Sequence, residues 1–536
     1  MSDAFLCQLD HLAVRDDALF GFGWAVPPRC RVATARLVLD FPDGSSRRVA
    51  ISIDRAREDV AAAFPHNPHA VNAGFLVLAG WPAAPPRSAA IEFDLTDGGR
   101  EIVPLALPPT DAPRQPAGVG WSYLLRRGWI HLRQGRLRAL LGKLRDFRHR
   151  SRAAIATMPE SELTTAIRGR SLTLVVDHAM GGGANAHRDR LVADALAGDA
   201  TVVLLTFVVS SLSLRAEVHE AGRPPRGFAV ADLDALAAAL AGGRLMRVVY
   251  NCGVSFPRPL DLGRFLRDSA RRRGVRLEVL IHDYFTVCPA AFLLDDRGSF
   301  CGVPDLDRCR ACLPKHEDGF VSLAGCTSID EWRRVWGGLL EAADEIRCFS
   351  DSSRRLLTRA YPAVGPRATV VPHDVAPLRR VRRSAPVPGD PLVVGVIGAI
   401  SHHKGAGVVA DLARAIEAAG KPVRIVVIGH LDAPCPREIV SETGAYRPAE
   451  LPGLVERHGV HLVLLPSICP ETFSFVAHET LAMGLPLMTL DLGAPADLAR
   501  GHPLGRVSPR SDGPGLLAEL LAFAADLADQ RLGAPA

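Results

Sequence analysis

Residues 1–112 alternate between apolar and polar positions. In "ARLVLDFPDGSSRRVAISID" two alternating runs flank Asp43-Gly44, and "AAIEFDLTDGGREIVPLAL" repeats this arrangement around Asp97-Gly98-Gly99. A period of two places successive side chains on opposite faces of a strand, and Asp-Gly pairs favour the tight turns that join antiparallel neighbours. The pattern therefore predicts antiparallel hairpins, and a small β-sandwich is the simplest fold that accommodates them.

The next stretch, 113–165, begins as a proline-rich linker and continues as a basic segment. In "WSYLLRRGWIHLRQGRLRALLGKLRDFRHRSR" apolar residues recur at helical spacing, arginines are frequent and Asp146 is the only acid. Two interpretations stay open for these basic helices. They either form a solvated connecting helix pair or present an amphipathic surface that docks on anionic lipid.

From residue 166 short apolar runs alternate with stretches of helical period. The runs include "SLTLVVD", "TVVLLTF", "MRVVYN" and "RLEVLIHD"; after "RRVRRSAPVPGDP" the pattern restarts with "LVVGVIGAI", "VRIVVIGH" and "HLVLLPS". Apolar runs of this length, separated by helices, are typical of buried parallel strands with helical crossovers. The sequence thus predicts two Rossmann-like domains in tandem, 166–380 and 381–536, the second ending in a C-terminal helix.

Length, composition and charge agree with this organisation. A chain of 536 residues is long enough for three or four domains at about 150 residues each, and 48% hydrophobic with 23% charged residues is ordinary for a globular protein. A net charge of +5 does not favour nucleic acid as a partner of the whole molecule.

The N-terminal segment and the lengths of the apolar runs indicate where in the cell the protein is expected. The N-terminal segment lacks a basic region followed by an apolar stretch, and no apolar run approaches the ~20 residues that span a bilayer. We therefore expect a cytoplasmic protein, with the basic segment as a route to the inner-membrane surface. Its eleven cysteines are then expected to be thiols or metal ligands rather than disulfides.

A glycine-containing loop follows the first strand of each predicted Rossmann-like domain. "DHAMGGGANAHRDRL" places Gly182 and Gly183 ahead of a helix, and "GVIGAISHHKGAG" places Gly398 at the end of a strand and Lys404 before the next helix. Bare amides at a helix start bind anions, and a lysine can reach a diphosphate as a point charge. Taken alone, the first loop is equally compatible with an ordinary strand-to-helix turn, and Lys404 alone is more simply explained as a solvated surface lysine.

The stretch "PSICPETFSFVAHETLAMGLP", residues 466–486, holds two glutamates around a predicted helix start. Glu471 lies on the loop, the first amides not bonded within the helix fall near Ser474 and Phe475, and Glu479 lies about two turns further on. Such amides hold a phosphate, and carboxylates accept hydrogen bonds from sugar hydroxyls. The stretch predicts a site for a phosphorylated, hydroxyl-rich ligand, with two surface glutamates as the simpler alternative.

Together these pieces resemble glycosyltransferase family 4. "PSICPETFSFVAHETLAMGLPLMTLDLGA" resembles its donor-site signature, E-x7-E, and "GAISHHKG", "VIGH", "TGAYRPAELPGLV", "SDSSRRLL" and "VVPHDV" are similar to other pieces of the family over 170–510. The resemblance implies a GT-B fold, that is, two facing Rossmann-like domains, here preceded by a β-rich accessory domain. It also implies retaining transfer from a nucleotide-diphosphate sugar, without a catalytic metal.

The resemblance assigns three residues to the reacting centre. Glu471 is expected on the hydroxyls of the transferred sugar, His282 facing that sugar, and Lys404 neutralising the charge of the leaving diphosphate. Glu479 is expected to bind the ribose of the donor. The other residues expected to bind the donor are Gly182, Gly183, Gly398, Ser474 and Phe475.

One position departs from the family pattern G-R-x-x-x-x-K-G, because Ala399 stands where the arginine is expected. His402, His403 and Arg447 are candidates for the missing cation. Two functions therefore stay open. One is a transferase that moves a sugar to a glycan or lipid-linked glycan in bacterial surface polysaccharide synthesis. The other is a weak or inactive GT-B protein that binds carbohydrate or acts as a scaffold.

Four cysteines lie close together in "HDYFTVCPAAFLLDDRGSFCGVPDLDRCRACL", namely Cys288, Cys301, Cys309 and Cys312. The C-x-x-C pair has the spacing of a zinc knuckle, and four thiolates complete a closed site. Four reduced thiols are equally compatible with the pattern. A zinc ion bound there would be structural, because four sulfurs leave no open position. As the resemblance implies, we expect no cofactor to be required for catalysis.

Overall fold

The computed structural model describes residues 4–15, 17–55, 57–81, 84–107, 157–271, 274–317, 324, 326, 328–382 and 390–532. The basic segment predicted in 113–165 lies, up to residue 156, outside the described residues. Its helices therefore stay a prediction.

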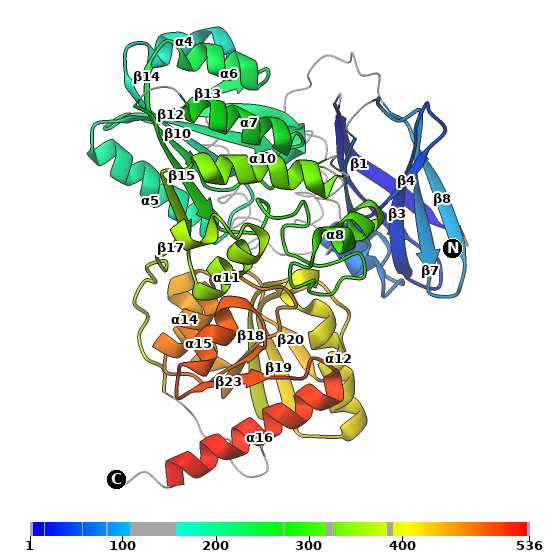
Figure 1. Ribbon diagram of the computed structural model, residues 1–536. Coiled ribbons are helices and arrows are strands. Elements are labelled where there is room, and N and C mark those ends of the chain that lie inside the picture. The colour runs from blue at the N-terminus through cyan, green and yellow to red at the C-terminus, as the bar shows by residue number, and fades with distance from the viewer. Residues whose placement is uncertain are drawn as a thin grey trace. The chain divides into compact units, whose positions relative to one another are not determined.

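The chain falls into two compact units (Figure 1). Unit 1 comprises Met1–Leu280, Phe285–Ala291 and Asp305–Ile346, and unit 2 comprises Ile281–Tyr284, Phe292–Pro304 and Arg347–Ala536. Two short segments that precede residue 347 in the sequence thus fold with the C-terminal unit.

Unit 1 begins with two four-stranded antiparallel sheets, ordered β1-β2-β6-β5 and β4-β3-β7-β8. Their elements are β1 (Leu6–Val14), β2 (Ala18–Val26), β3 (Val32–Asp40), β4 (Ser46–Ala50), β5 (Ser52–Arg55), α1 (Glu58–Ala63), β6 (Gly74–Gly80), β7 (Ser88–Leu95) and β8 (Arg100–Leu105). Leu19 and Val77 of the first sheet share one buried core with Leu37 and Phe93 of the second. The turn glycine of each predicted Asp-Gly hairpin has positive φ, as such turns require.

Seven strands of a nine-stranded α/β sheet form the second part of unit 1, in the order β15-β14-β10-β11-β12-β13-β9. The other two strands of this sheet are β16 (Glu345–Cys348) and β17 (Thr369–Val370). Its strands are β9 (Thr157–Met158), β10 (Ser171–His178), β11 (Thr201–Val208), β12 (Ser213–His219), β13 (Arg226–Val230), β14 (Arg244–Tyr250) and β15 (Arg276–Ile281). Its helices are α4 (Glu160–Ile167), α5 (Gly183–Ala197), α6 (Leu233–Leu240), α7 (Pro259–Ala270), α8 (Leu306–Cys312) and α10 (Ile329–Ala342).

This sheet corrects one prediction. The strands β15, β14, β10 and β11 are parallel as predicted, but β12 and β13 form an antiparallel extension that the sequence pattern missed. The link from β11 to β12 is only the short turn around Val209–Ser211, and a parallel crossover needs a dozen or more residues. An antiparallel return is the only pairing that this link permits.

Unit 2 contains a six-stranded parallel sheet ordered β20-β19-β18-β21-β22-β23. Its strands are β18 (Leu392–Ile400), β19 (Val423–Leu431), β20 (Val440–Glu442), β21 (Leu462–Leu465), β22 (Leu487–Leu490) and β23 (Gly505–Ser508). Counted along the chain, this order is 3-2-1-4-5-6, the order of dinucleotide-binding Rossmann sheets. A short parallel pair, β16 (Glu345–Cys348) and β17 (Thr369–Val370), precedes it with α11 (Asp351–Ala360).

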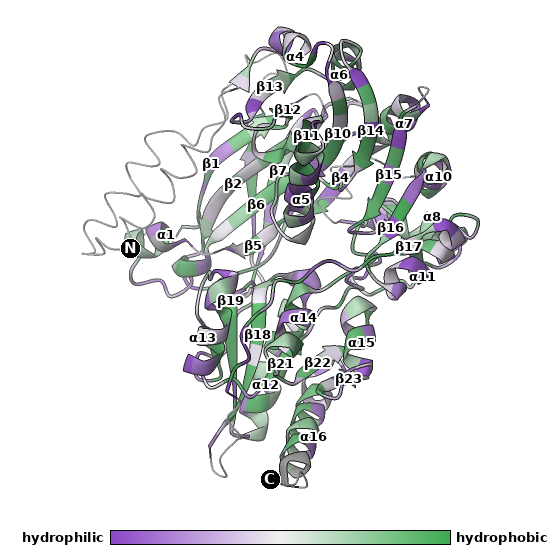
Figure 2. Ribbon diagram, turned by 90° about the vertical axis from the view of Figure 1, so that its left-hand side faces the viewer, coloured by the Kyte–Doolittle hydropathy of each residue, from purple (hydrophilic) through white to green (hydrophobic). Residues whose placement is uncertain are grey.

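Helices cover both faces of this sheet, whose apolar strands are visible in Figure 2. They are α12 (Ala406–Ala419), α13 (Leu451–Arg457), α14 (Phe475–Ala482), α15 (Gly493–Arg500) and α16 (Gly513–Leu532). Leu412 of α12 and Leu520 of α16 belong to one buried cluster, while Val455 of α13 and Ala477 of α14 belong to a second. Strands buried on both faces explain why the sequence shows continuous apolar runs here.

Two Rossmann-like α/β sheets preceded by antiparallel β-sheets confirm the predicted fold class. Within the described part of the chain, no helix combines the length and the apolar character needed to traverse a bilayer.

Candidate functional site

The site lies where the strand order of the unit 2 sheet reverses. From β18 the chain proceeds to β19 on one side, whereas from β21 it proceeds to β22 on the other. Ligands of such sheets bind at the carboxyl ends of the two strands that flank the reversal. The 401–405 loop follows β18 and the 466–474 loop follows β21, so these loops carry the candidate side chains.

An ion pair joins the two loops. Lys404 Nζ donates to Glu471 Oε1 at 2.9 Å, and Ser467 Oγ donates to the same oxygen at 2.5 Å. The Glu471 side chain is 9% exposed and that of Lys404 is 39% exposed. The sequence placed both residues at the site, but it did not predict that they bind each other.

The ion pair keeps both groups charged. Burial works to raise the pKa of the Glu471 carboxyl, but the Lys404 charge and the Ser467 hydroxyl outweigh it, so that this pKa lies below its ordinary value. Burial works to lower the pKa of Lys404, and the Glu471 carboxylate outweighs it, so that the lysine pKa is raised. At neutral pH the site therefore presents one ammonium and one carboxylate.

Backbone contacts hold the loops together. The Ile468 N–H donates to the His403 carbonyl at 3.1 Å. Gly405 has φ of 87°, and a Cβ there would lie 2.0 Å from the Pro466 carbonyl oxygen. Glycine is therefore required at this position by both its backbone conformation and the close approach of the second loop.

Helix α14 starts at the end of the 466–474 loop. Ser474 is its N-cap, with extended backbone and a side chain that accepts from the Ala477 N–H at 3.4 Å. The amides at the first positions of the helix, starting at Phe475, have no carbonyl partner within the helix. This arrangement supplies the phosphate-binding amides that the sequence predicted around Ser474 and Phe475.

Glu479 lies on α14, one turn beyond these amides. Burial raises the pKa of its carboxyl above the ordinary value. Burial and the charge of Glu479 together raise the pKa of the Tyr446 phenol to about 12, which places the two side chains in one electrostatic environment. The structure thus associates Glu479 with the segment that follows β20.

His282 directly follows β15 but folds with unit 2. Thr472 Oγ1 donates to its carbonyl oxygen at 2.7 Å, and its ring stacks on Phe349 with centroids 4.3 Å apart. The His373 ring lies 5.2 Å from it and contacts Phe473 in turn. Sequence reasoning placed His282 at the site but missed this aromatic cluster, whose only local signal is the spacing of rings in "TFSFVAH".

His403 is excluded as the replacement for the missing arginine. Its ring stacks on Phe292 with centroids 3.9 Å apart and an interplanar angle of 8°. Burial, and then the charge of Lys404, lower the pKa of His403 to about 4, so that it is uncharged at neutral pH. Ala399 itself is exposed and pairs in register with His430 of β19, whereas Arg447 is exposed and precedes the turn before α13.

The first glycine loop belongs to unit 1, at the carboxyl end of β10. Gly182 is the N-cap of α5 with φ of 90°, and Gly183 is the first residue of that helix. The Gly181 N–H donates to Asn185 Oδ1 at 2.6 Å, which fixes the loop from the first turn of the helix. Gly398 ends β18 in unit 2, with φ of 120°.

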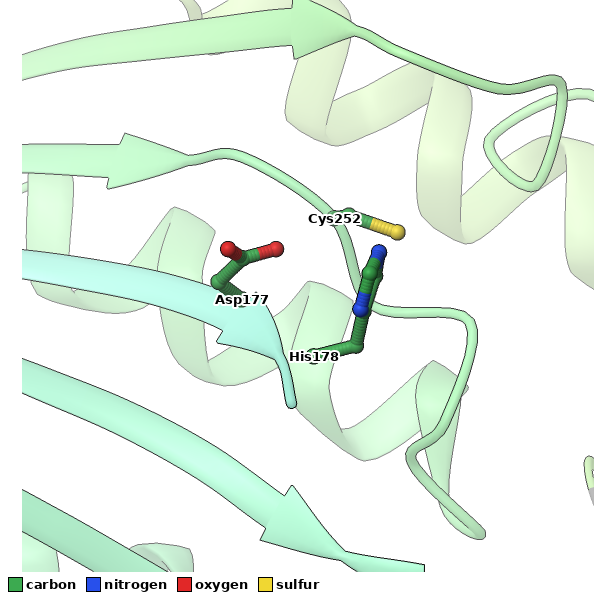
Figure 3. A group of neighbouring side chains, drawn as sticks. All are labelled: Asp177, His178 and Cys252. Carbon is green, nitrogen blue, oxygen red and sulfur yellow. The ribbon is translucent and has the colours of Figure 1, made fainter. Parts of the chain in front are cut away.

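A buried cluster beside this loop has the composition of a metal site (Figure 3). Ligand atoms of Asp177, His178 and Cys252 lie within 4.8 Å of one another. However, the Met180 N–H donates to His178 Nδ1 at 3.1 Å, and the Asn185 amide lies 3.5 Å from the same nitrogen. Because Nδ1 accepts, the ring proton is on Nε2, and neither nitrogen offers a lone pair to a metal. The cluster does not fit a metal ion.

The four cysteines of the predicted zinc site are all half-buried. Cys309 and Cys312 lie one turn apart on α8, where side chains three positions apart are neighbours on the helix surface. Cys288 belongs to unit 1 with them, whereas Cys301 belongs to unit 2. The four-thiol zinc site stays a prediction.

No protein-family model matches the sequence, and no curated protein is significantly similar to it. Among solved structures, the chain is similar to HepE from Anabaena, crystallised with UDP-glucose, with 14% identity over 67% of this chain and 90% of HepE and a TM-score of 0.43. A glycosyltransferase from Rickettsia africae shows 11% identity over 67% and 89% of the two chains, with a TM-score of 0.40. The pneumococcal O-GlcNAc transferase GtfA, crystallised with UDP and GlcNAc, shows 12% identity over 55% of each chain, with a TM-score of 0.30. Similarities of this size concern the fold alone.

Proposed function

We propose that the protein is a retaining glycosyltransferase of family 4 and that unit 2 binds a nucleotide-diphosphate sugar. One observation carries the proposal. The Lys404–Glu471 ion pair lies at the strand-order reversal of a 3-2-1-4-5-6 sheet, where it joins the loop after β18 to the loop that leads into α14. Sheets of this order bind nucleotides at that edge.

The diphosphate would bind between the start of α14 and Lys404. Amides at a helix N-terminus stabilise an anion by roughly 0.3–1 kcal/mol, and more where the site is partly buried. The half-exposed Lys404 adds a full positive charge. The ammonium of Lys404 has three N–H donors, so it can keep its bond to Glu471 and also donate to the diphosphate.

The Glu471 carboxylate also has a role in this proposal. Its pKa is held below the ordinary value, so Glu471 stays ionised and accepts hydrogen bonds from hydroxyls of the transferred sugar. Glu479, further along α14, accepts from the ribose hydroxyls. His282 faces the sugar from the aromatic cluster beside the 466–474 loop.

The same groups account for catalysis. Negative charge develops on the departing diphosphate, so preorganised amides and Lys404 stabilise the transition state more than the ground state. In this proposal no metal takes part in the chemistry, and a zinc ion on the four cysteines of 288–312 is structural. The acceptor is a glycan or lipid-linked glycan of the bacterial surface, reached from the cytoplasmic side of the inner membrane through the basic segment.

Nucleotide binding tests the proposal directly. We expect one of UDP, GDP, ADP and dTDP to raise the melting temperature of unit 2, since a ligand at 100 times its Kd stabilises by about 2.7 kcal/mol. Glu479→Ala should abolish most of this shift. Glu417→Ala, at an exposed glutamate on α12, is the matched control and should leave it unchanged. No shift with any nucleotide in the wild type would refute the proposal.

The position of Ala399 favours a second function, a weak or inactive protein that binds carbohydrate or serves as a scaffold. Its side chain is exposed at the end of β18 and supplies no charge, and His403 is uncharged. Slow release of nucleotide diphosphate from a donor sugar in the absence of acceptor separates the two functions. Only an active transferase shows this release, and Lys404→Ala should lower it.

A further inference from the structure

A short hairpin, residues 292–304, folds with unit 2 although it precedes β16 in the sequence. Its two arms meet at a bridge between Leu294 and Phe300. Asp295 closes the tip, because its N–H donates to the Ser299 carbonyl at 2.7 Å and its carboxylate accepts from the Arg297 N–H at 3.0 Å. The tip is thus an ordered turn.

Both ends of this hairpin hold strained backbone. Leu293 has φ of 53° and Val303 has φ of 54°, and both side chains are buried. Left-handed backbone is uncommon for any residue with a side chain and is an outlier for β-branched valine. Conformations of this kind persist only where surrounding contacts determine them, and they concentrate at functional sites.

The hairpin contacts the 401–405 loop at two places. Phe292, next to the strained Leu293, stacks on His403 with centroids 3.9 Å apart. At the tip, a Cβ on Gly298 would lie 3.6 Å from His402 Nε2. The hairpin therefore lies against the two residues that immediately precede Lys404.

The loop is also held by its own turn and by the 466–474 loop. His402–Lys404 is a single 3-10 turn, with the Lys404 N–H donating to the Ser401 carbonyl and the Gly405 N–H to that of His402. His403 is its best-held residue, because Nδ1 lies 3.2 Å from Ser401 Oγ and its carbonyl accepts from the 466–474 loop. An uncharged ring beside Lys404 also avoids repulsion of the ammonium.

We propose that Phe292 and His403 are positioning residues, through which the 292–304 hairpin holds Lys404 against Glu471 and in reach of the donor diphosphate. The diphosphate part rests on the proposed function, whereas the placement of Lys404 against Glu471 does not. Neither ring touches the reacting atoms in this proposal. They act by restricting the loop from which the lysine extends.

Lysine labelling measures this placement without any substrate. Only the neutral amine reacts with an amine-specific reagent, and the Glu471 contact keeps the pKa of Lys404 raised. Phe292→Ala should release the loop, lower this pKa and speed labelling of Lys404 by about 2- to 10-fold, the range that one stacked ring pair accounts for. Peptide mass spectrometry across a pH series gives both the rate and the pKa.

Two variants separate positioning from general loosening. Phe292→Tyr keeps the stacked ring and should restore the wild-type labelling profile. Phe300→Ala removes the same atoms from the same hairpin at a residue whose ring is not the one stacked on His403, and it should leave the profile unchanged. Unchanged labelling in Phe292→Ala, or equal acceleration in both alanine variants, would overturn the inference.

Nucleotide binding is measured on the same variants. Weaker binding of the best nucleoside diphosphate by Phe292→Ala, by a similar 2- to 10-fold factor, is the expected result. If Lys404 labelling responds as predicted but the wild type binds no nucleotide, the positioning inference stands and the proposed function fails. If nucleotide binds but labelling does not respond, the positioning inference fails and the proposed function stands.

Discussion

The ion pair between Lys404 and Glu471 leads to a sharp stability prediction. Lys404→Met keeps most of the aliphatic side chain and removes the charge together with its 2.9 Å hydrogen bond to Glu471. The carboxylate would keep its hydrogen bond from Ser467 but would lose the neighbouring cation. Because Glu471 is nearly buried, water cannot replace that cation well.

The cost follows from the exposure of the two partners. Removing one partner of a fully buried ion pair costs about 3–5 kcal/mol, whereas a fully exposed pair contributes about 0–1 kcal/mol. With Glu471 9% exposed and Lys404 39% exposed, we expect Lys404→Met to lower the free energy of unfolding by an amount between these limits, about 1–3 kcal/mol at pH 7.

The loss should depend on pH. In the wild type the pKa of Glu471 lies below its unfolded value of about 4.3, so its contribution is complete above that pH and disappears as the pH falls through the lower folded pKa. In Lys404→Met burial acts without the cation, and the pKa of Glu471 should rise instead. The stability difference between wild type and variant is therefore largest at pH 7. It shrinks as the pH falls, first through the raised pKa of Glu471 in the variant, above about pH 4.3, and then through the lowered pKa in the wild type.

Hydrogen exchange of peptides from β18 and β21 is the appropriate assay, because a chain of several domains has no single unfolding free energy. A double-mutant cycle with Glu471→Gln should show a coupling energy of about 1–3 kcal/mol. Equal protection in wild type and Lys404→Met at pH 7, the same loss at pH 4 and pH 7, or additive single variants would each refute the reasoning.

Two further predictions concern other parts of the fold. The side chain of Arg57 is 8% exposed and forms ion pairs with Asp10 and Asp59 at 2.7 Å each. Arg57→Met leaves both carboxylates buried without this cation, so it should lower the free energy of unfolding of the N-terminal sheets by about 3–5 kcal/mol in thermal or hydrogen-exchange experiments. A decrease below about 1 kcal/mol would contradict this prediction. Gly405→Ala should destabilise the fold by at least the roughly 1–2 kcal/mol that left-handed backbone costs a residue with a side chain. Because its Cβ would lie 2.0 Å from the Pro466 carbonyl oxygen, it should also separate the two loops and abolish nucleotide binding. Unchanged binding would show that the two loops tolerate separation.

Much of the fold was predictable because its signals are local. The period of two in residues 1–112 and the Asp-Gly turns predicted the antiparallel hairpins that the structure contains. Continuous apolar runs predicted the parallel strands of both α/β sheets, since these strands are buried on both faces. The Ser474 cap and the start of α14 likewise follow from residues that are neighbours in sequence.

For the candidate site, the positions of single residues were predictable from the sequence, but their contacts were not. Sequence alone placed Lys404, Glu471, Ser474 and Glu479 on loops and on a helix start, because each depends on the end of one strand or the beginning of one helix. It could not predict that Lys404 binds Glu471, since the two are 67 positions apart and their contact depends on β18 and β21 being adjacent. Strand adjacency is a property of the whole sheet.

Tertiary structure also decided which chemistry is excluded. Sequence left His403 open as a cation, but the stack on Phe292 buries the ring and lowers its pKa to about 4. The antiparallel β12 and β13, and the folding of 281–284 and 292–304 with the C-terminal unit, were equally invisible. The His403 stack and the folding of 292–304 with the C-terminal unit depend on contacts between residues far apart in the chain, and no local pattern of residues specifies the burial and desolvation that stabilise them. The antiparallel β12 depends instead on the short turn after β11, which the pattern of apolar runs does not reveal.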